Sequence, residues 1–344
     1  MISDATAQGR AGWNLFVREH YPPIGAFMQT WEWGEFQKAL GRKVERFFVG
    51  TSRKPDASFM LVHYALPMGY SYGYIPRGPV MARHAAGEEV SLGVFESIKQ
   101  WAQKHLPHLL FLRLEPPLEA IAPEAAKRGF STPEYYVQPR YNLAVSLSVT
   151  EEEILSGFHP STRSNIRRAQ NRGVTVKTKP KMAEADYQQF FSMTQDTIKR
   201  NSGTNAYPDP LYFRALVNSI PVLAEKYDSE KLSLGIFYGY QNGEPAALHF
   251  VLFFGDTATY LYGASYTSRL SSKVTTYLHW AAMQEAKKRG LKFYDLGGID
   301  EQRWPTLTNF KRQFRGREFS YVGNVDIPIR PALYKSYNVF KKFR

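Results

Sequence analysis

The stretch KLSLGIFYGYQNGEPAALHFVLFFGDTATYLYGAS, residues 231–265, decides the fold class of this chain. Its three apolar runs are rich in aromatic and β-branched residues, which favour strands. Asn242-Gly243 and Gly255-Asp256 separate the runs, and both dipeptides are typical of tight hairpin turns. The stretch therefore predicts three consecutive antiparallel strands.

The residues that follow extend this motif. Residues 273–290 are expected to form a helix, and the apolar run at 291–296 closes the motif as a further strand. The first half of the chain has the same order of elements, so the architecture repeats although the sequence does not. We expect two similar domains that divide near Thr150, with a ligand cleft between them. The first-half elements are expected at residues 44–50, 57–66, 69–80, 88–105 and 108–116.

Helices are also expected outside the repeated motif. Thr150 and Glu153 have the spacing of a capping box, which predicts that a helix begins there. The fold class is therefore α/β (α+β), with two domains that each hold a mixed, mainly antiparallel sheet flanked by helices. The additional helices are expected at residues 32–40, 118–129, 150–158, 161–173, 185–200 and 209–220.

Composition excludes several classes of protein. The 344 residues include no cysteine, so disulfides, a cysteine nucleophile and thiolate metal sites are excluded. The eight histidines are scattered, and we expect no metal site. The longest apolar runs, such as residues 247–254, are too short to span a bilayer, and the first sixteen residues lack the apolar core of a secretory signal. We expect a cytoplasmic protein that contacts the inner face of the membrane.

The net charge of +13 is unevenly distributed. No acidic residue occurs between Ile154 and Ala183 or after Asp326, although both segments are rich in cations. This clustering predicts an anionic partner, whereas an even distribution would only aid solubility. The cations are Arg163, Arg167, Arg168, Arg172, Lys177, Lys179 and Lys181 in the first segment, and Arg330, Lys335, Lys341, Lys342 and Arg344 in the second.

Four of these arginines belong to one predicted helix. Arg163 and Arg167 are four residues apart and share one face, and Arg168 and Arg172 share an adjacent face. Such a helix can bind the phosphates of a polyanion such as RNA. The alternative is a solvated helix surface.

The segment YDLGGIDEQRWPTLTNFKRQFRG, residues 294–316, is the strongest candidate for chemistry. Asp295 ends a strand, and Gly297 and Gly298 allow a sharp turn or a close approach to a ligand. Pro305 can open a helix that carries the pair Phe310-Lys311. Lys311 is then either a solvated surface lysine or a lysine that faces a carbonyl or phosphate group.

Seven motifs, in this order, resemble the Fem family (FemABX type) of peptidoglycan bridge-forming aminoacyltransferases, in a short form without the coiled-coil arm. The resemblance implies two tandem GNAT-like domains, residues 1–149 with 316–344 and residues 150–315. It also implies transfer of an amino acid from aminoacyl-tRNA, as co-substrate, to the side-chain amine of a peptidoglycan stem peptide, by a monomer without a cofactor. The motifs are TWEWGEFQKALG (30–41), YIPRGPV (74–80), LRLEPP (112–117), RSNIRRAQNRGVTV (163–176), YLYGAS (260–265), YDLGGI (294–299) and FKRQF (310–314).

The resemblance implies a catalytic role for Lys311 with Phe310. The ammonium group would stabilise the oxyanion of acyl transfer or hold the terminal phosphate of tRNA. Glu115 stands where the family often has an aspartate, and it could accept the proton of the attacking amine. The alternative for Glu115 is a structural ion pair with Arg113 or Arg77.

The resemblance also implies a set of precursor-binding residues. Tyr260 and Tyr262 are expected on the same face of a strand, because side chains alternate; a core aromatic cluster is the alternative. Arg77 in its proline-rich loop is expected to clamp an anion or to brace the loop. The complete substrate-binding set is Lys38, Tyr74, Arg77, Tyr260, Tyr262, Asp295, Gly297 and Gly298.

Two departures from the family pattern concern the form of the precursor. Family members that use a UDP-linked precursor bind its diphosphate with a lysine in the first helix and an arginine in the second domain. Lys38 lies one residue from the first position, and Pro208 lies near the second. A lipid-linked precursor is therefore an alternative to a UDP-linked one.

Other functions are open on the same fold. An acyl-CoA-dependent N-acyltransferase needs a glycine-rich pyrophosphate turn, and residues 170–175 and 313–318 match it only in part. An aminoacyl-tRNA-dependent transferase that modifies lipids is a second alternative. A non-catalytic RNA-binding protein is a third, and it would leave the segment from Asp295 to Lys311 without a role.

Overall fold

The chain folds into two compact units, Met1–Arg140 with Ser320–Arg344, and Tyr141–Phe319. The computed structural model describes residues 1–22, 24–51, 54–85, 87–121, 123–133, 135–201, 205 and 207–341. Lys342 and Arg344 of the basic tail lie outside these residues, and so does the side chain of Lys341. The sequence placed the boundaries at 149 and 315, but strand β7 (Tyr141–Ser146) pairs within the sheet of the second unit, which moves the first boundary to 140.

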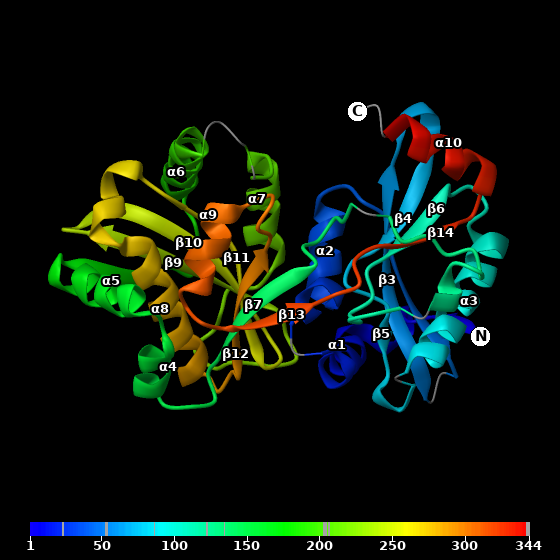
Figure 1. Ribbon diagram of the computed structural model, residues 1–344, viewed down its shortest axis with the longest axis horizontal. Coiled ribbons are helices and arrows are strands. Elements are labelled where there is room, and N and C mark those ends of the chain that lie inside the picture. Colours follow the sequence, from blue (N-terminus) through cyan, green and yellow to red (C-terminus); the bar gives the residue numbers. More distant parts are fainter. Residues whose placement is uncertain are drawn as a thin grey trace. The chain divides into compact units, whose positions relative to one another are not determined.

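The first unit is built on a mixed sheet with the strand order β1-β2-β3-β4-β6-β14, and β5 pairs with β3 (Figure 1). Strands β4 and β6 pair in parallel, and helix α3 makes the crossover between them. The apolar side of α3 packs on β2, β3 and β6. Its elements are β1 (Ile2–Asp4), α1 (Gly9–His20), α2 (Trp31–Ala39), β2 (Val44–Gly50), β3 (Pro55–Ala65), β4 (Ser71–Ile75), β5 (Val80–Met81), α3 (Glu88–His105), β6 (Phe111–Leu114), β14 (Val325–Pro328) and α10 (Pro331–Lys341).

The second unit repeats this arrangement, with the strand order β13-β7-β12-β11-β10-β9-β8. Strands β9, β10 and β11 form the two predicted hairpins, and β11 pairs in parallel with β12 after the crossover helix α8. The two mixed sheets confirm the predicted fold class. The elements are α4 (Glu151–Gly157), α5 (Pro160–Asn171), β8 (Val174–Thr178), α6 (Glu184–Arg200), α7 (Pro210–Ser219), β9 (Ser233–Gln241), β10 (Glu244–Phe254), β11 (Thr257–Ser265), α8 (Val274–Lys288), β12 (Phe293–Ile299), α9 (Pro305–Arg312) and β13 (Arg317–Ser320).

Helices cover both faces of the second sheet. Helix α8 packs on one face, where Leu278 and Met283 join a core with Val251 and Phe253 of β10. Helices α6 and α7 pack on the other face, where the rings of Phe190 and Phe213 contact Phe250. Residues 250 and 251 point to opposite faces because side chains alternate along a strand. None of the described helices is both long enough and apolar enough to cross a membrane.

The helix expected at residues 118–129 is wrong. In the described part of this segment only a 3-10 turn, Pro123–Ala125, is present. Pro123 has no N–H to donate and disfavours helical backbone in the residue before it, so a helix could not run through this position. The expected strand at 108–116 is likewise reduced to β6, which ends before the pair Pro116-Pro117.

Candidate functional site

The parallel strands β11 and β12 stay paired for only a short distance. Their register joins Thr257 to Phe293 and ends with Thr259 against Asp295. Immediately afterwards β12 bulges against β7, and Gly297 has a φ of 80°. A positive φ at this position favours glycine. The backbone of β12 therefore turns where its parallel partner ends.

Asp295 holds this turn in place. Its carboxylate accepts the Gly297 N–H at 2.8 Å and the side-chain amide of Asn142 at 3.1 Å. Asp295 is fully buried. A Cβ on Gly297 would lie 3.3 Å from the carbonyl oxygen of Tyr260 and 3.5 Å from Nζ of Lys311. The sequence motif around Asp295 and the glycines thus forms a tight seat for the lysine.

Lys311 projects from α9 into this seat. Its side chain is 5% exposed, and Nζ donates to the carbonyl oxygen of Gly298 at 2.6 Å. Its other two N–H groups have no hydrogen-bond partner among the described residues. Burial lowers the pKa of Lys311 to about 8, and the nearby Asp295 carboxylate opposes this shift. Lys311 is therefore a buried cation at neutral pH with donors to spare, and not a solvated surface lysine.

A group of buried rings surrounds the lysine. Phe310 lies 5.8 Å from the ring of His279 and 5.6 Å from that of Phe314. Nδ1 of His279 lies 3.1 Å from the hydroxyl of Tyr294. Burial lowers the pKa of His279 well below its usual value, and the Lys311 charge acts in the same direction. These rings therefore add no second cation beside Lys311.

Tyr260 and Tyr262 do not share a face, so the expectation from simple alternation is wrong. A β-bulge lies between the pairs Phe250–Tyr262 and Val251–Tyr260. One extra residue in a strand reverses the direction of every side chain beyond it. Tyr260 consequently contacts His249 and His279, with ring centroids 4.8 and 4.6 Å away, on the face covered by α8. Tyr262 faces α7 instead.

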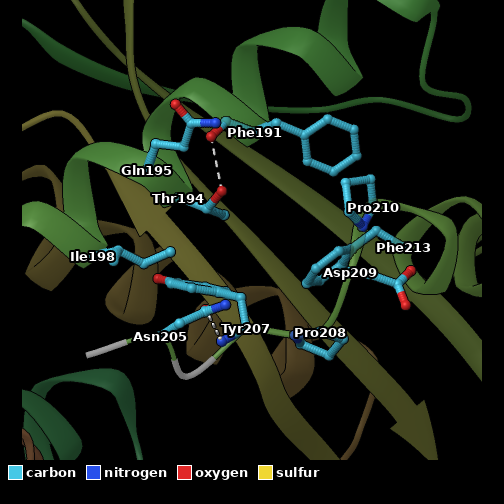
Figure 2. Close-up of a pocket in the computed structure, with 10 residues that line it drawn as sticks. All are labelled: Phe191, Thr194, Gln195, Ile198, Asn205, Tyr207, Pro208, Asp209, Pro210 and Phe213. Carbon is cyan, nitrogen blue, oxygen red and sulfur yellow. Dashed lines mark hydrogen bonds between the residues drawn. The ribbon is translucent and has the colours of Figure 1, made fainter. Parts of the chain in front are cut away.

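Tyr262 adjoins a pocket of about 320 Å³ between α6, α7 and the segment before α7 (Figure 2). Its ring lies 5.2 Å from Phe213 and 6.5 Å from Tyr207, which both line the pocket. Tyr207 is fixed by a hydrogen bond from its hydroxyl to the carbonyl oxygen of Gly263, 2.7 Å. The pocket is lined by Phe191, Thr194, Gln195, Ile198, Asn205, Tyr207, Pro208, Asp209, Pro210 and Phe213.

In the first unit, Glu115 occupies the position equivalent to the start of the β12 turn. It is 2% exposed and accepts the Tyr74 hydroxyl at 2.5 Å, the Gln138 N–H at 2.9 Å and the Arg77 N–H at 3.4 Å. Burial raises the pKa of Glu115, while the charge of Arg77 opposes the shift. Burial also raises the pKa of Tyr74. Glu115 and Tyr74 thus form a satisfied, closed network.

Arg77 is engaged within the first unit. Its guanidinium donates to the Pro139 carbonyl at 2.7 Å and lies 4.0 Å from the ring centre of Tyr321. Its φ of 48° places the loop in a strained conformation that these contacts maintain. Arg113, the other partner weighed for Glu115, instead pairs with Asp326 of β14 at 2.7 Å. The arrangement matches the loop-bracing alternative for Arg77.

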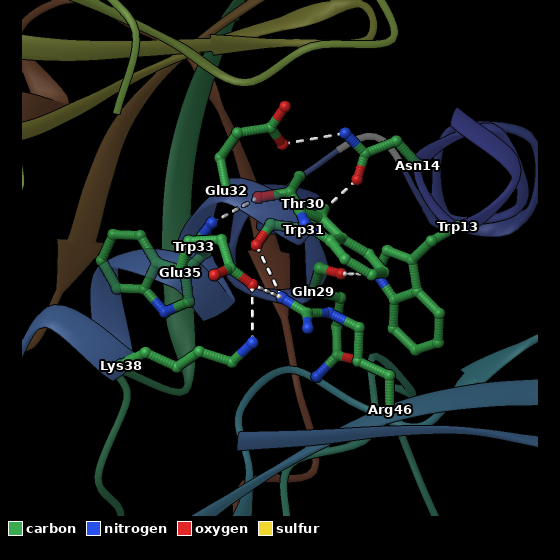
Figure 3. A network of polar contacts seen from close by, with 10 residues as sticks. All are labelled: Trp13, Asn14, Gln29, Thr30, Trp31, Glu32, Trp33, Glu35, Lys38 and Arg46. Carbon is green, nitrogen blue, oxygen red and sulfur yellow. Dashed lines mark hydrogen bonds and ion pairs between the residues drawn. The ribbon is translucent and has the colours of Figure 1, made fainter. Parts of the chain in front are cut away.

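Lys38 belongs to a polar network on α2 (Figure 3). Its Nζ donates to Glu35 at 3.0 Å, and the same carboxylate oxygen accepts from Arg46 at 3.1 Å. The Arg46 guanidinium lies 3.9 Å from the ring centre of Trp31. Lys38 is about half exposed, and it shares the Glu35 carboxylate with Arg46.

The four arginines at α5, three within the helix and Arg172 at its C-cap, fall into two pairs. Arg163 donates to the carbonyl oxygens of Ser156 and Phe158 at 2.9 and 2.6 Å, and Arg172 donates to that of Ser271. These two arginines secure the ends of the helix. Arg167 and Arg168 are exposed and have no hydrogen bond or ion pair with any residue that the structure describes.

Comparison of the sequence with known protein families identifies the family of this chain. The FemAB family model matches residues 11–127, 124–220 and 236–342. The chain belongs to the FemAB family. A curated relative of this FemAB chain, the "Lipid II:glycine glycyltransferase" of Staphylococcus aureus, is 24% identical over 196 residues, which are 53% of the chain and 45% of the relative. The match therefore spans less than half of that relative's length.

Solved structures of similar fold cover nearly the whole FemAB chain. A crystal structure of FemX has a TM-score of 0.78 at 19% identity, and covers 97% of this chain and 99% of its own. A tandem GNAT protein from the clavulanic acid biosynthesis pathway has a TM-score of 0.54 at 9% identity, and covers 96% and 98%. These likenesses establish two tandem GNAT-like units.

Sequence reasoning missed several residues that lie beside the candidate groups of each unit. His249 and His279 were dismissed as scattered, yet both lie beside Tyr260. Asn142 and Gln138 were not considered, yet they bind the Asp295 and Glu115 carboxylates. The only available signal was a polar residue within an otherwise apolar strand, as at Asn142 in YNLAVS and His249 in ALHFVLFF.

Proposed function

We propose that this chain is an aminoacyltransferase that moves an amino acid from aminoacyl-tRNA to the side-chain amine of the stem peptide in a lipid-linked peptidoglycan precursor. The observation that carries the proposal is the buried Lys311 ammonium with two unused donors. A buried charge is costly unless it is paired, and such groups concentrate at functional sites. Family membership supports the reaction class, since the Staphylococcus relative is named a glycyltransferase that acts on lipid II.

The reaction needs positioning and charge stabilisation more than it needs a cofactor. The amine nitrogen attacks the carbonyl carbon of the aminoacyl ester, and a C–N bond forms. The C–O bond to the tRNA ribose then breaks, and the proton lost by the amine passes to the departing ribose oxygen. The intermediate carries its negative charge on the former carbonyl oxygen. The two spare N–H groups of Lys311 are suited to stabilise that oxygen, or the terminal phosphate of the tRNA.

We infer that the amino acid comes from a tRNA because α5 carries exposed cations. Arg167 and Arg168 are available to phosphates, whereas Arg163 and Arg172 support the helix itself. Each lysine or arginine that meets a phosphate adds a salt-dependent contribution to binding. We therefore expect charge reversal at Arg167 and Arg168 to raise the KM for aminoacyl-tRNA and to leave kcat nearly unchanged.

A lipid-linked acceptor is favoured over a UDP-linked one by two residues. Lys38 is paired with Glu35, and Pro208 lies near the position where the family pattern has the diphosphate-binding arginine. The pocket beside Tyr262 is mainly apolar and aromatic, which suits the peptide or sugar part that both forms of the precursor share. The reaction would then take place at the inner face of the membrane.

The test is a transfer assay with radiolabelled aminoacyl-tRNA and either lipid-linked or UDP-linked precursor. Lys311→Ala should lower kcat by at least roughly a hundredfold, the usual effect of removing an oxyanion donor. Lys288→Ala, which removes an exposed lysine of α8, is the matched control and should transfer normally.

Three results would contradict the proposal. Undiminished transfer by Lys311→Ala would remove the assigned role of this lysine. Transfer from acyl-CoA in place of aminoacyl-tRNA would make the chain an N-acyltransferase. Transfer to a lipid headgroup in place of the stem peptide would make it a lipid-modifying enzyme.

A further inference from the structure

The tip of the β3–β4 hairpin exposes a large apolar side chain. Met68 is 86% exposed and has a left-handed backbone conformation with a φ of 59°. The hydrogen bond from the Leu66 N–H to the Tyr70 carbonyl, 2.7 Å, closes the hairpin around it. A fully exposed methionine at a protruding tip contributes nothing to the fold of the first unit. Met68 is therefore available to a partner outside the chain.

Cations gather at the same end of the first unit. The α2–β2 connection lies beside the end of β3, because the His63 N–H donates to the Lys43 carbonyl at 3.0 Å and Arg42 covers the ring of Tyr64. The loop after α3 joins the start of β4 through the Leu110 N–H and the Ser71 carbonyl, 2.8 Å. Lys104 at the end of α3 therefore lies near the hairpin as well.

The helix α10 borders this end of the sheet (Figure 1). Tyr334 and Tyr337 pack on Phe111, and Leu66 of the hairpin joins the same cluster. Lys335 of α10 is exposed, and so are Leu333 and Val339. These contacts bring α10 and the hairpin to one surface.

The charge of this surface is strongly biased. Residues 40–45, 63–72, 103–110 and 329–339 are all described and contain five lysines and arginines but one carboxylate, that of Glu45. Glu45 is already bound to Lys43 at 3.1 Å and to His63 at 2.6 Å. Cations with so little local compensation favour an anionic partner.

We propose that this surface, formed by Met68, Arg42, Lys43, Lys104 and Lys335, docks on an anionic lipid bilayer. Peripheral binding needs two signals together, an inserted apolar group and electrostatic attraction to anionic headgroups. Met68 at the hairpin tip supplies the first, and the surrounding cations supply the second. RNA is the weaker choice, since an exposed methionine gains little from phosphates, whereas a bilayer interior buries it.

The inference rests on the proposed function, because docking would bring the enzyme to a lipid-linked acceptor. The test is co-sedimentation with vesicles that contain equal parts of phosphatidylglycerol and phosphatidylcholine, compared with vesicles of phosphatidylcholine alone. The parent chain should bind only the anionic vesicles, and less at high salt. Met68→Asp should weaken binding roughly tenfold, the effect of failing to bury one methionine. The double variant Lys104→Glu/Lys335→Glu should weaken it by at least as much.

Two control variants test whether the effect is specific to this surface. Leu211→Asp changes another exposed apolar residue, 72% exposed, on α7, and Lys288→Glu changes an exposed lysine on α8. Both should bind vesicles like the parent, and the Met68 variant should keep the parent's thermal unfolding. Equal binding by Met68→Asp and the parent would overturn the proposal. The proposal would also fail if excess RNA displaced the parent from the vesicles while Met68→Asp bound the vesicles normally. The surface would then be an RNA-binding surface.

Catalysis is measured separately from docking. Lys311→Ala should bind vesicles like the parent even when it transfers nothing. Met68→Asp should retain transfer to a soluble stem-peptide acceptor. If the parent binds vesicles as expected but transfers no amino acid to any acceptor, the proposed function fails and the docking surface remains supported.

Discussion

The two units place polar residues at the same point of the same fold and use them differently. In the first unit, Glu115 follows the parallel pair β4 and β6, and its carboxylate accepts bonds from Tyr74, Gln138 and Arg77. In the second unit, the parallel pair β11 and β12 ends at Asp295, and Lys311 occupies the space beyond it with one bond, to Gly298. The buried carboxylate of the first junction therefore has hydrogen-bond partners for its oxygens, whereas the buried ammonium of the second has a partner for one of its three N–H groups.

Under the proposed function, this difference separates a structural junction from a reactive one. A buried polar group that has all its partners adds to the stability and specificity of the fold. A buried ammonium with spare donors costs stability, and an enzyme retains it because the transition state supplies the missing partner. Removing the charged group should therefore raise the free energy of unfolding at the second junction and lower it at the first.

The largest effect is expected at Lys311. The pKa of about 8 in the folded chain lies below the usual lysine pKa of 10.5, so the unfolded chain binds more protons between these values. The cost of burial is then fully present below pH 8 and disappears as the pH rises towards 10.5. Lys311→Met should be inactive yet more stable than the parent by up to about 3 kcal/mol at pH 7, with the gain vanishing near pH 10.5.

Urea unfolding of both proteins at several pH values measures this difference. Lys288→Met is the control and should unfold like the parent at every pH. A Lys311→Met chain that is less stable than the parent at pH 7 would mean that the ammonium supports the fold.

A smaller effect of opposite sign is expected at Glu115. The amide of Glu115→Gln cannot accept all the bonds that the carboxylate accepts, because one of its two polar atoms is a donor. Unfolding should become easier by about 1–3 kcal/mol, the usual cost of unsatisfied buried groups. Transfer per folded molecule should stay unchanged.

Thermal unfolding and kcat, measured on the same preparation, test this expectation. A large fall in kcat without a loss of stability would instead support the proton-accepting role that the sequence suggested for Glu115.

The smallest effect is expected at Gly297. Gly297→Ala introduces a Cβ 3.3 Å from the Tyr260 carbonyl, in a conformation with φ at 80°. Gly290 has nearly the same φ, 81°, but nothing lies within 4 Å of its added Cβ. Both alanine variants should lose about 1 kcal/mol of stability from backbone strain.

Only the Gly297 variant should also lose transfer activity, because its methyl group crowds the Tyr260 carbonyl and must shift the turn that lies beside Lys311. Steady-state kinetics of the two variants side by side gives the answer. Equal activity of the Gly297 and Gly290 variants would show that transfer does not depend on the position of the turn beside Lys311.

The sequence predicted the repeated motif because its signals are local. Strand composition, the turn dipeptides and the Thr150–Glu153 capping box each act within a few residues, and the structure contains all of them. The Fem-family resemblance also located Lys311, although composition alone left its burial undecided.

The remaining features depend on contacts between distant segments. The bulge at Phe250 and Val251 separates Tyr260 from Tyr262, and no local pattern marks it. The buried pair of Arg113 and Asp326 joins residues 213 positions apart. The positions that complete the Lys311 site, such as Asn142 beside Asp295, likewise arise from pairing of β7 with β12 and could not be read from spacing.

The first unit is discontinuous, and this has a consequence for how the protein is made. Strand β14 reaches its place beside β6 only after the ribosome has synthesised all of residues 141–319. Until then the Arg113 guanidinium lacks the Asp326 carboxylate that neutralises it in the interior. All residues of the second unit are thus synthesised before β14, while the first unit must wait for a segment that follows residue 319.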